Sequence, residues 1–201
     1  MIKENEKRVL GVQLATDPRW VNLAEKELEE ILTDHAYCEQ KATTTCISLI
    51  QRYPDKEFLV EKVAPVVSEE WSHFRMVVKE LKKRGLRLGK QRKDVYVNEL
   101  MKFQRKGVSE SEVLLDKLMV CAMIEARSCE RFRLLSKYVS DDSLKEFYHQ
   151  FMISEAGHYK MFLEIARYYV DSDIVEKRWN DCLEFEANIL KNIEIRADRM
   201  H

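Results

Sequence analysis

Apolar residues recur at intervals of three and four along five long segments of the chain, which is the period of an amphipathic α-helix. The predicted helices run over about residues 18–51, 55–84, 111–138, 142–169 and 173–199. The only long connection follows Gly85–Gly89, after the second helix. Two short turns and one long crossover are typical of the ferritin-like four-helix bundle. We therefore expect a single all-α domain over residues 1–201, with the crossover between helices 2 and 3 and an additional C-terminal helix.

Two local signals refine the boundaries of these helices. Thr16 or Asp17 stands ahead of Pro18, and proline suits the first turn of a helix, so one of the two is expected to cap the first helix. Pro65 lies inside the second predicted helix and is expected to kink it.

In each of the first four predicted helices, the apolar residues form a stripe along one face, and a glutamate interrupts that stripe. Two of these glutamates are followed three residues later by a histidine. That spacing places both side chains on one helix face. Buried carboxylates would repel one another unless a cation compensates them. Glutamates from two helices and Glu-x-x-His from two others form the ligand set of ferritin-like di-iron and di-manganese proteins. The predicted ligands are Glu39, Glu70, His73, Glu125, Glu155 and His158.

The turns between the helices test this ligand set. Facing residues of an antiparallel hairpin lie equally far from its turn. The midpoint of Glu39 and Glu70 is 54.5, beside Pro54, and that of Glu125 and Glu155 is 140, at Ser140. Both midpoints fall on turn-forming sequence. The halves also align as a repeat, 86 residues apart at Glu39 and Glu125, with weaker matches at Lys41/Arg127 and Leu49/Leu135.

Other polar residues near these stripes receive a different interpretation. Glu146-x-x-His149 has the same motif form, but it does not lie opposite Glu125 across the turn, and it is on another face of its helix than His158. We therefore expect it at the surface. Glu69 and Glu130 lie off the stripes. His35, one turn before Glu39, is either a partner of that site or an ordinary core histidine, which we favour. Gly157 is either simply tolerated or gives room for close packing or substrate entry.

Composition limits the function without choosing one. The five cysteines contain no C-x-x-C pair, which is typical of reduced thiols in a cytoplasmic protein. No stretch approaches twenty apolar residues, so no membrane span is expected, and the N-terminus has no apolar run of a secretion signal. A net charge of -1 argues against general coating of nucleic acid.

Several segments resemble the MiaE-like tRNA hydroxylases. They are DHAYCEQKA (34–42), SEEWSHF (68–74), the crossover KELKKRGLRLGKQRKDVYVNEL (79–100), IEARSCERF (124–132) and SEAGHYKMF (154–162). The resemblance implies hydroxylation of the isopentenyl group of 2-methylthio-isopentenyladenosine in tRNA. It also implies two Fe ions, O2 as co-substrate and an external electron donor of the reductase or ferredoxin type. Carried over by motif, its ligands are the same six residues, and no catalytic side chain is predicted outside the metal centre.

The crossover holds the only dense run of one charge, with seven basic residues in twelve positions. With the family resemblance, these residues are predicted to bind tRNA phosphates, and without it a solvated loop is the better interpretation. Tyr96 is expected to stack on a base if its ring is exposed. The residues predicted to bind phosphate are Lys82, Lys83, Arg84, Arg87, Lys90, Arg92 and Lys93.

Three other functions stay open. A di-iron oxidase or oxygenase acting on a small molecule would need no basic crossover. Iron storage or peroxide detoxification would need a shell-forming oligomer, for which a long basic loop is awkward. A metal-free helical interaction module would leave four buried carboxylates unexplained. The sequence prefers iron over manganese only weakly, because both accept the same oxygen and imidazole ligands.

Overall fold

The structure is a computed structural model that describes residues 9–193 and 199–200. The chain divides into two compact units. Unit 1 comprises Met1–Pro18 and Val95–Glu194, and unit 2 comprises Arg19–Asp94 and Ile195–His201. All regular structure in the described residues is helical. None of their helices combines the length and the low charge that a bilayer-spanning helix requires.

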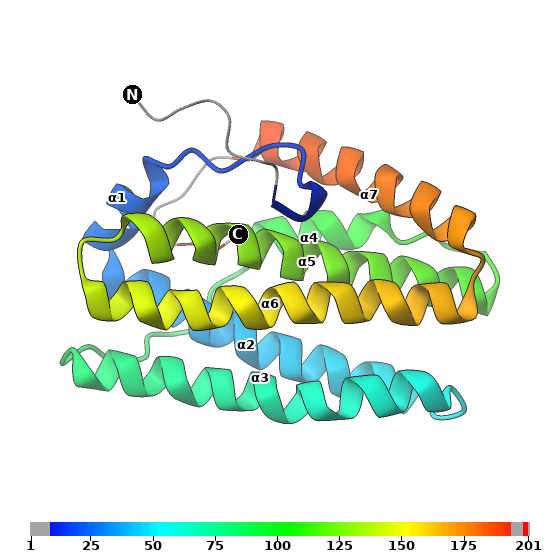
Figure 1. Ribbon diagram of the computed structural model, residues 1–201, viewed down its shortest axis with the longest axis horizontal. Helices are drawn as coiled ribbons and strands as arrows, with labels where there is room; N and C mark the ends of the chain where they lie inside the picture. The colour runs from blue at the N-terminus through cyan, green and yellow to red at the C-terminus, as the bar shows by residue number, and fades with distance from the viewer. Residues whose placement is uncertain (1–8, 194–198, 201) are drawn as a thin grey trace. The chain divides into compact units, whose positions relative to one another are not determined.

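Unit 2 is built on two long helices, α2 (Leu28–Arg52) and α3 (Glu57–Lys83), which lie side by side in Figure 1. A shorter helix, α1 (Trp20–Lys26), precedes them. The prediction of one helix over 18–51 is wrong, because Glu27 leaves helical geometry at φ −115° and ψ 41° and separates α1 from α2. The helix α3 runs unbroken through Pro65.

Unit 1 contains the second long pair, α5 (Glu110–Tyr138) and α6 (Asp142–Tyr169), which also lie side by side in Figure 1. Local sequence explains where they begin. Ser109 and Glu112 form a capping box on α5, and Asp141 accepts hydrogen bonds from the first backbone amides of α6. The remaining elements of the unit are η1 (Val9–Gly11), α4 (Val95–Leu100), η2 (Met101–Phe103) and α7 (Ser172–Asn192).

The fifth helix ends earlier than predicted. The backbone at Ile193 is extended, at φ −107° and ψ 145°, so α7 stops at Asn192. Of the expected remainder, residues 194–198 lie outside the described residues. Arg199 belongs to unit 2, where its Nη1 donates a hydrogen bond of 2.8 Å to Oδ1 of Asp34. Periodicity alone did not reveal this stop, because the apolar pattern continues past it.

The crossover between α3 and α5 is confirmed as the long connection, and α4 and η2 lie within it. Its first part is tied to unit 2. The backbone amide of Gly89 donates to Oγ1 of Thr33, and Nζ of Lys41 lies 2.5 Å from Oδ2 of Asp94. A Cβ at Gly89 would stand 3.3 Å from the methyl of Thr33, so only glycine approaches this closely without a shift.

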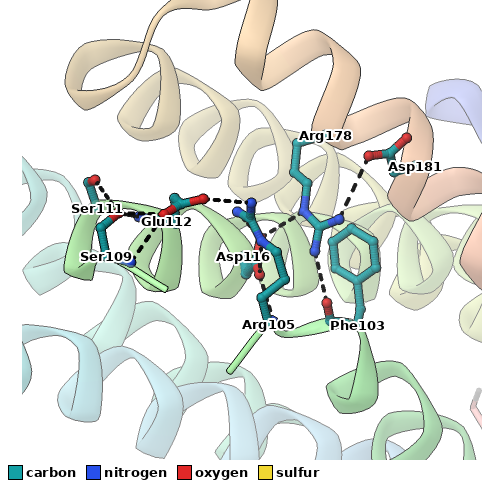
Figure 2. A network of polar contacts seen from close by, with 8 residues as sticks. All are labelled: Phe103, Arg105, Ser109, Ser111, Glu112, Asp116, Arg178 and Asp181. Carbon is teal, nitrogen blue, oxygen red and sulfur yellow. Dashed lines mark hydrogen bonds and ion pairs between the residues drawn. The ribbon is translucent and has the colours of Figure 1, made fainter. Parts of the chain in front are cut away.

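The second part of the crossover is tied to unit 1 by the ion network of Figure 2. Asp116 on α5 accepts hydrogen bonds from Arg105 of the crossover and from Arg178 of α7. Arg178 also donates to the carbonyl of Phe103 and stacks over its ring. Burial raises the pKa of the Asp116 carboxyl, but the hydrogen bonds from the two arginines outweigh burial and leave the pKa below its usual value.

A buried arginine network also joins α5 to α7. Arg127, which is fully buried, pairs with Glu130 at 3.1 Å and with Glu186 of α7 at 2.7 Å. Glu130 also accepts hydrogen bonds from the backbone amide and hydroxyl of Thr16. Glu130 is indeed off the ligand stripe, but it belongs to this second buried cluster. Thr16 therefore does not cap the first helix, whose N-cap residue, Arg19, makes no side-chain cap.

Candidate metal centre

Unit 2 gathers three of the predicted ligands where α2 faces α3. Glu39 comes from α2, and Glu70 and His73 come from α3. One ligand atom of each lies within 4.8 Å of the others. Nδ1 of His73 stands 3.4 Å from a carboxylate oxygen of Glu39 and 3.4 Å from one of Glu70. All three side chains are buried.

His35 is part of the surroundings of this cluster. It is 0% exposed, and its Nε2 lies 2.7 Å from Oε1 of Glu39, one helical turn away. When Glu39 is ionised, as it must be to bind a metal, it can only accept, and the imidazole is then the donor. The hydrogen bond favours a partner of the site over an ordinary core histidine, because the partner of His35 is a predicted ligand. A hydrogen bond of this kind orients a metal-binding carboxylate.

The electrostatics of the unit 2 cluster fit a bound cation. Burial raises the pKa of Glu39, and the neighbouring Glu70 carboxylate raises it further. Burial lowers the pKa of His73, but its hydrogen bonds to Glu39 and Glu70 outweigh burial and raise it to about 9. In the metal-free protein, a proton on His73 therefore supplies positive charge between two carboxylates. A divalent cation would replace that charge and leave the imidazole neutral, as a metal ligand must be.

Unit 1 gathers the other three predicted ligands where α5 faces α6. Glu125 comes from α5, and Glu155 and His158 come from α6. One ligand atom of each lies within 4.8 Å of the others, and Nδ1 of His158 stands 3.8 Å from Oε2 of Glu125. All three are buried. Each helix pair thus presents two carboxylates and one imidazole, a donor set that suits iron or manganese.

Cys121 takes the place on α5 that His35 takes on α2, because each stands four residues before the glutamate of its helix. The thiol of Cys121 is buried. Burial, followed by the charge of Glu125, raises its pKa to about 12. The side chain beside Glu125 is therefore a neutral thiol, whereas the one beside Glu39 is a hydrogen-bonding imidazole.

The residues assigned to the surface are exposed: Glu69, Glu146 and His149 all face solvent. The structure also removes one of the interpretations of Gly157. A Cβ built there meets nothing within 4 Å, so Gly157 does not serve close packing.

The basic run of the crossover is partly committed to unit 2. Arg84 pairs with Glu80 at 2.7 Å, and Arg92 pairs with Glu30. The condition for base stacking by Tyr96 is not met, because its ring is buried and its hydroxyl donates to Glu186 at 3.2 Å. The exposed members of the run are Lys82, Lys83, Arg87, Lys90 and Lys93.

The family is decided by comparison with known proteins. The profile described as "tRNA-(MS[2]IO[6]A)-hydroxylase (MiaE)" matches residues 3–201. The chain belongs to this family. Its sequence is 37% identical over 156 residues to the tRNA 2-(methylsulfanyl)-N(6)-isopentenyladenosine(37) hydroxylase of Pseudomonas putida, which covers 78% of this chain and 75% of the relative. It is 27% identical over 235 residues to the protein of the same name from Salmonella typhimurium, covering 92% of this chain and 85% of that one.

A solved structure supports the fold class. The chain resembles "Protein 43 with aldehyde deformylating oxygenase activity from Synechococcus" with a TM-score of 0.88 and 31% identity, over 94% of each chain. The prediction of an all-α, ferritin-like fold is therefore confirmed.

Proposed function

We propose that this MiaE family member is an O2-dependent di-iron monooxygenase that hydroxylates the isopentenyl group of 2-methylthio-isopentenyladenosine in tRNA. The observation that carries the proposal is the pair of buried clusters, each with two carboxylates and one imidazole. Family membership over residues 3–201 selects the substrate. Because the proposed substrate is tRNA, we propose that the reaction takes place in the cytoplasm.

In this proposal the two clusters together hold two iron ions. The ligands are Glu39, Glu70, His73, Glu125, Glu155 and His158. Bound iron would supply the activation of O2 that amino-acid side chains lack. His35 would hold the Glu39 carboxylate in one orientation through its hydrogen bond of 2.7 Å.

The overall reaction defines what else the protein needs. One oxygen atom of O2 enters the C–H bond of the isopentenyl group, and the other leaves as water with two protons and two electrons. The electrons come from an external donor, which we propose to be a reductase or ferredoxin-type protein.

We also propose that the exposed cations of the crossover bind tRNA phosphates. Lys82, Lys90 and Lys93 lie on the surface, and neutralising phosphates with such side chains makes affinity depend on salt. Replacing both Lys90 and Lys93 by glutamine should raise KM for tRNA without changing kcat. The slope of log affinity for tRNA against log salt concentration should become shallower by about 1 for each phosphate that the variant no longer neutralises.

The test of the function is a hydroxylation assay. Iron-loaded protein would receive O2, reductant and tRNA that carries the unhydroxylated nucleoside, and nucleosides would be examined by mass spectrometry with isotopically labelled O2. We expect one labelled oxygen atom in the prenyl group, and none with the Glu70→Ala variant. Iron-loaded protein that leaves this nucleoside unchanged would contradict the proposal.

One observation supports a second candidate. The structural neighbour is named for aldehyde deformylating oxygenase activity. A di-iron oxygenase acting on a small molecule is therefore the alternative, and long-chain aldehydes belong in the same assay. Turnover of aldehydes without hydroxylation of the tRNA nucleoside would favour this alternative.

A further inference from the structure

A surface pocket of about 540 Å³ lies along the groove between α5 and α6 in unit 1. Three of its seven lining residues are small, namely Cys129, Ala156 and Gly157. Gly157 leaves open space where a side chain would stand. Ile153, 59% exposed, adds an apolar side chain at the surface. We call this feature the α5–α6 pocket.

The wall of the α5–α6 pocket is adjacent in the chain to the predicted ligands of unit 1. Gly157 stands between Glu155 and His158 on α6, and Cys129 lies one helical turn after Glu125 on α5. The Cys129 thiol donates to the carbonyl of Met152 at 3.4 Å and so joins the two helices across the wall. A molecule in the pocket would therefore lie behind the backbone that carries three ligands.

None of the six predicted ligands lines the pocket. Hydroxylation requires the substrate carbon to reach the metal-binding groups. A carbon held in this pocket would not touch them. Transfer of an electron needs only a short path through the protein, and the wall residues Cys129 and Gly157 lie within one helical turn of the predicted ligands. The geometry therefore favours delivery of electrons over binding of the reacting carbon.

The charge of the pocket indicates the partner. Arg133 from α5 and Lys160 from α6 provide a cation on each side, and no acidic residue is among the lining residues. A cationic rim around an apolar centre suits a partner with acidic groups around an apolar patch.

We propose that the α5–α6 pocket is the docking surface for the electron donor, a small acidic protein that carries one electron at a time. This inference rests on the proposed function. Two successive encounters deliver the two electrons that, with two protons and O2, yield the hydroxylated product and one water. The oxidised carrier leaves after each transfer.

Charge reversal at the rim tests this assignment. The probe is a plant-type [2Fe–2S] ferredoxin, reduced by its NADPH-dependent reductase and titrated into assays of the iron-loaded protein with tRNA. We expect the Arg133→Glu, Lys160→Glu variant to raise KM for ferredoxin about tenfold and to weaken its salt dependence. As a charge control, Lys177→Glu on α7, which is exposed and does not line the pocket, should leave that KM unchanged.

Peroxide separates failure of docking from failure of the proposed function. Hydrogen peroxide supplies the oxygen atom and both electrons, since R–H and H2O2 give R–OH and water without a donor. The double variant should therefore match wild type within about twofold when peroxide drives the reaction. Inactivity of wild type with peroxide as well as with ferredoxin would contradict the function itself.

Other outcomes would overturn the docking assignment alone. One is an unchanged KM for ferredoxin in the double variant. A second is a raised KM for tRNA with an unchanged KM for ferredoxin, which would make the pocket a nucleic-acid surface. The third is wild type that works with peroxide but not with the acidic carrier.

Discussion

The helix pairs α2/α3 and α5/α6 carry the same carboxylates and histidines at corresponding positions, but their surroundings differ. In α2/α3 the glutamate of the first helix is held by His35 at 2.7 Å. In α5/α6 the corresponding neighbour of Glu125 is Cys121, a thiol whose pKa burial raises to about 12. The ligand set is repeated, whereas the residues that orient it are not.

A second difference lies two residues beyond each of these glutamates. Lys41 on α2 is half-buried and pairs with Asp94 of the crossover. Arg127 on α5 is fully buried and pairs with Glu130 and Glu186. Buried carboxylates on these helices therefore have two kinds of partner. Glu130 and Glu186 pair with Arg127, whereas the carboxylates of the two Glu/His clusters have histidine beside them.

The largest expected effect comes from removing the built-in cation. Arg127→Met leaves Glu130 and Glu186 buried without their partner, and should lower the free energy of unfolding by about 3–5 kcal/mol. Lys41→Met, at the corresponding position of the other pair, should cost about 1 kcal/mol or less, because its ion pair is partly exposed. Urea denaturation of both variants measures the difference. Equal costs would contradict the distinction between the two helices.

The next effect concerns the anchor of the crossover on α5. The pKa of Asp116 is lowered in the folded protein, so its ion pairs stabilise the fold above the unfolded pKa and lose that effect as pH falls through the folded pKa. Asp116→Asn should lower the free energy of unfolding by about 2 kcal/mol at pH 7. The deficit should shrink below about pH 4, where the wild-type carboxyl protonates in the unfolded chain. A deficit that does not depend on pH would show that ionisation of Asp116 is not the cause.

The asymmetry between His35 and Cys121 predicts unequal effects on the metal. His35→Leu removes the hydrogen bond to Glu39 and should weaken iron affinity about 10–100-fold, and His35→Gln should restore part of the loss. Cys121→Ala should change affinity little, because a neutral thiol does not orient Glu125. Competition with a metal chelator gives both affinities. Similar losses in the His35→Leu and Cys121→Ala variants would remove the asymmetry.

The smallest effect has the opposite sign. Because the pKa of Glu39 is raised by burial and by Glu70, its ionisation costs stability as pH rises above the unfolded value. In metal-free protein at pH 7, Glu39→Gln should therefore raise the free energy of unfolding, because the variant no longer has to ionise a buried carboxyl beside Glu70. The stabilisation that iron gives to wild type should be lost in the same variant. Destabilisation of the metal-free variant would mean that Glu39 is compensated as fully as Glu130.

The meeting of the predicted ligands on facing helices could be predicted because it follows from helix period and turn position, which are both local. Glu39 and Glu70 flank their turn at equal distance, and so do Glu125 and Glu155. The roles of Glu130 and Tyr96 could not be predicted, because their partners lie far away in the chain. Glu130 accepts a hydrogen bond from Thr16, and Tyr96 donates one to Glu186. The break at Glu27 was missed because the apolar pattern runs through it. For His35, the sequence placed the side chain on the correct face but did not choose its partner.

The central claim is that the two clusters bind a pair of iron ions, and metal content tests it most directly. Wild type expressed with iron should hold about two irons per chain. The Glu39→Ala, Glu125→Ala variant should hold none, while the exposed pair Glu61→Ala, Glu146→Ala should match wild type. Wild type without stoichiometric iron, or a Glu39→Ala, Glu125→Ala variant that holds as much iron as wild type, would contradict the claim.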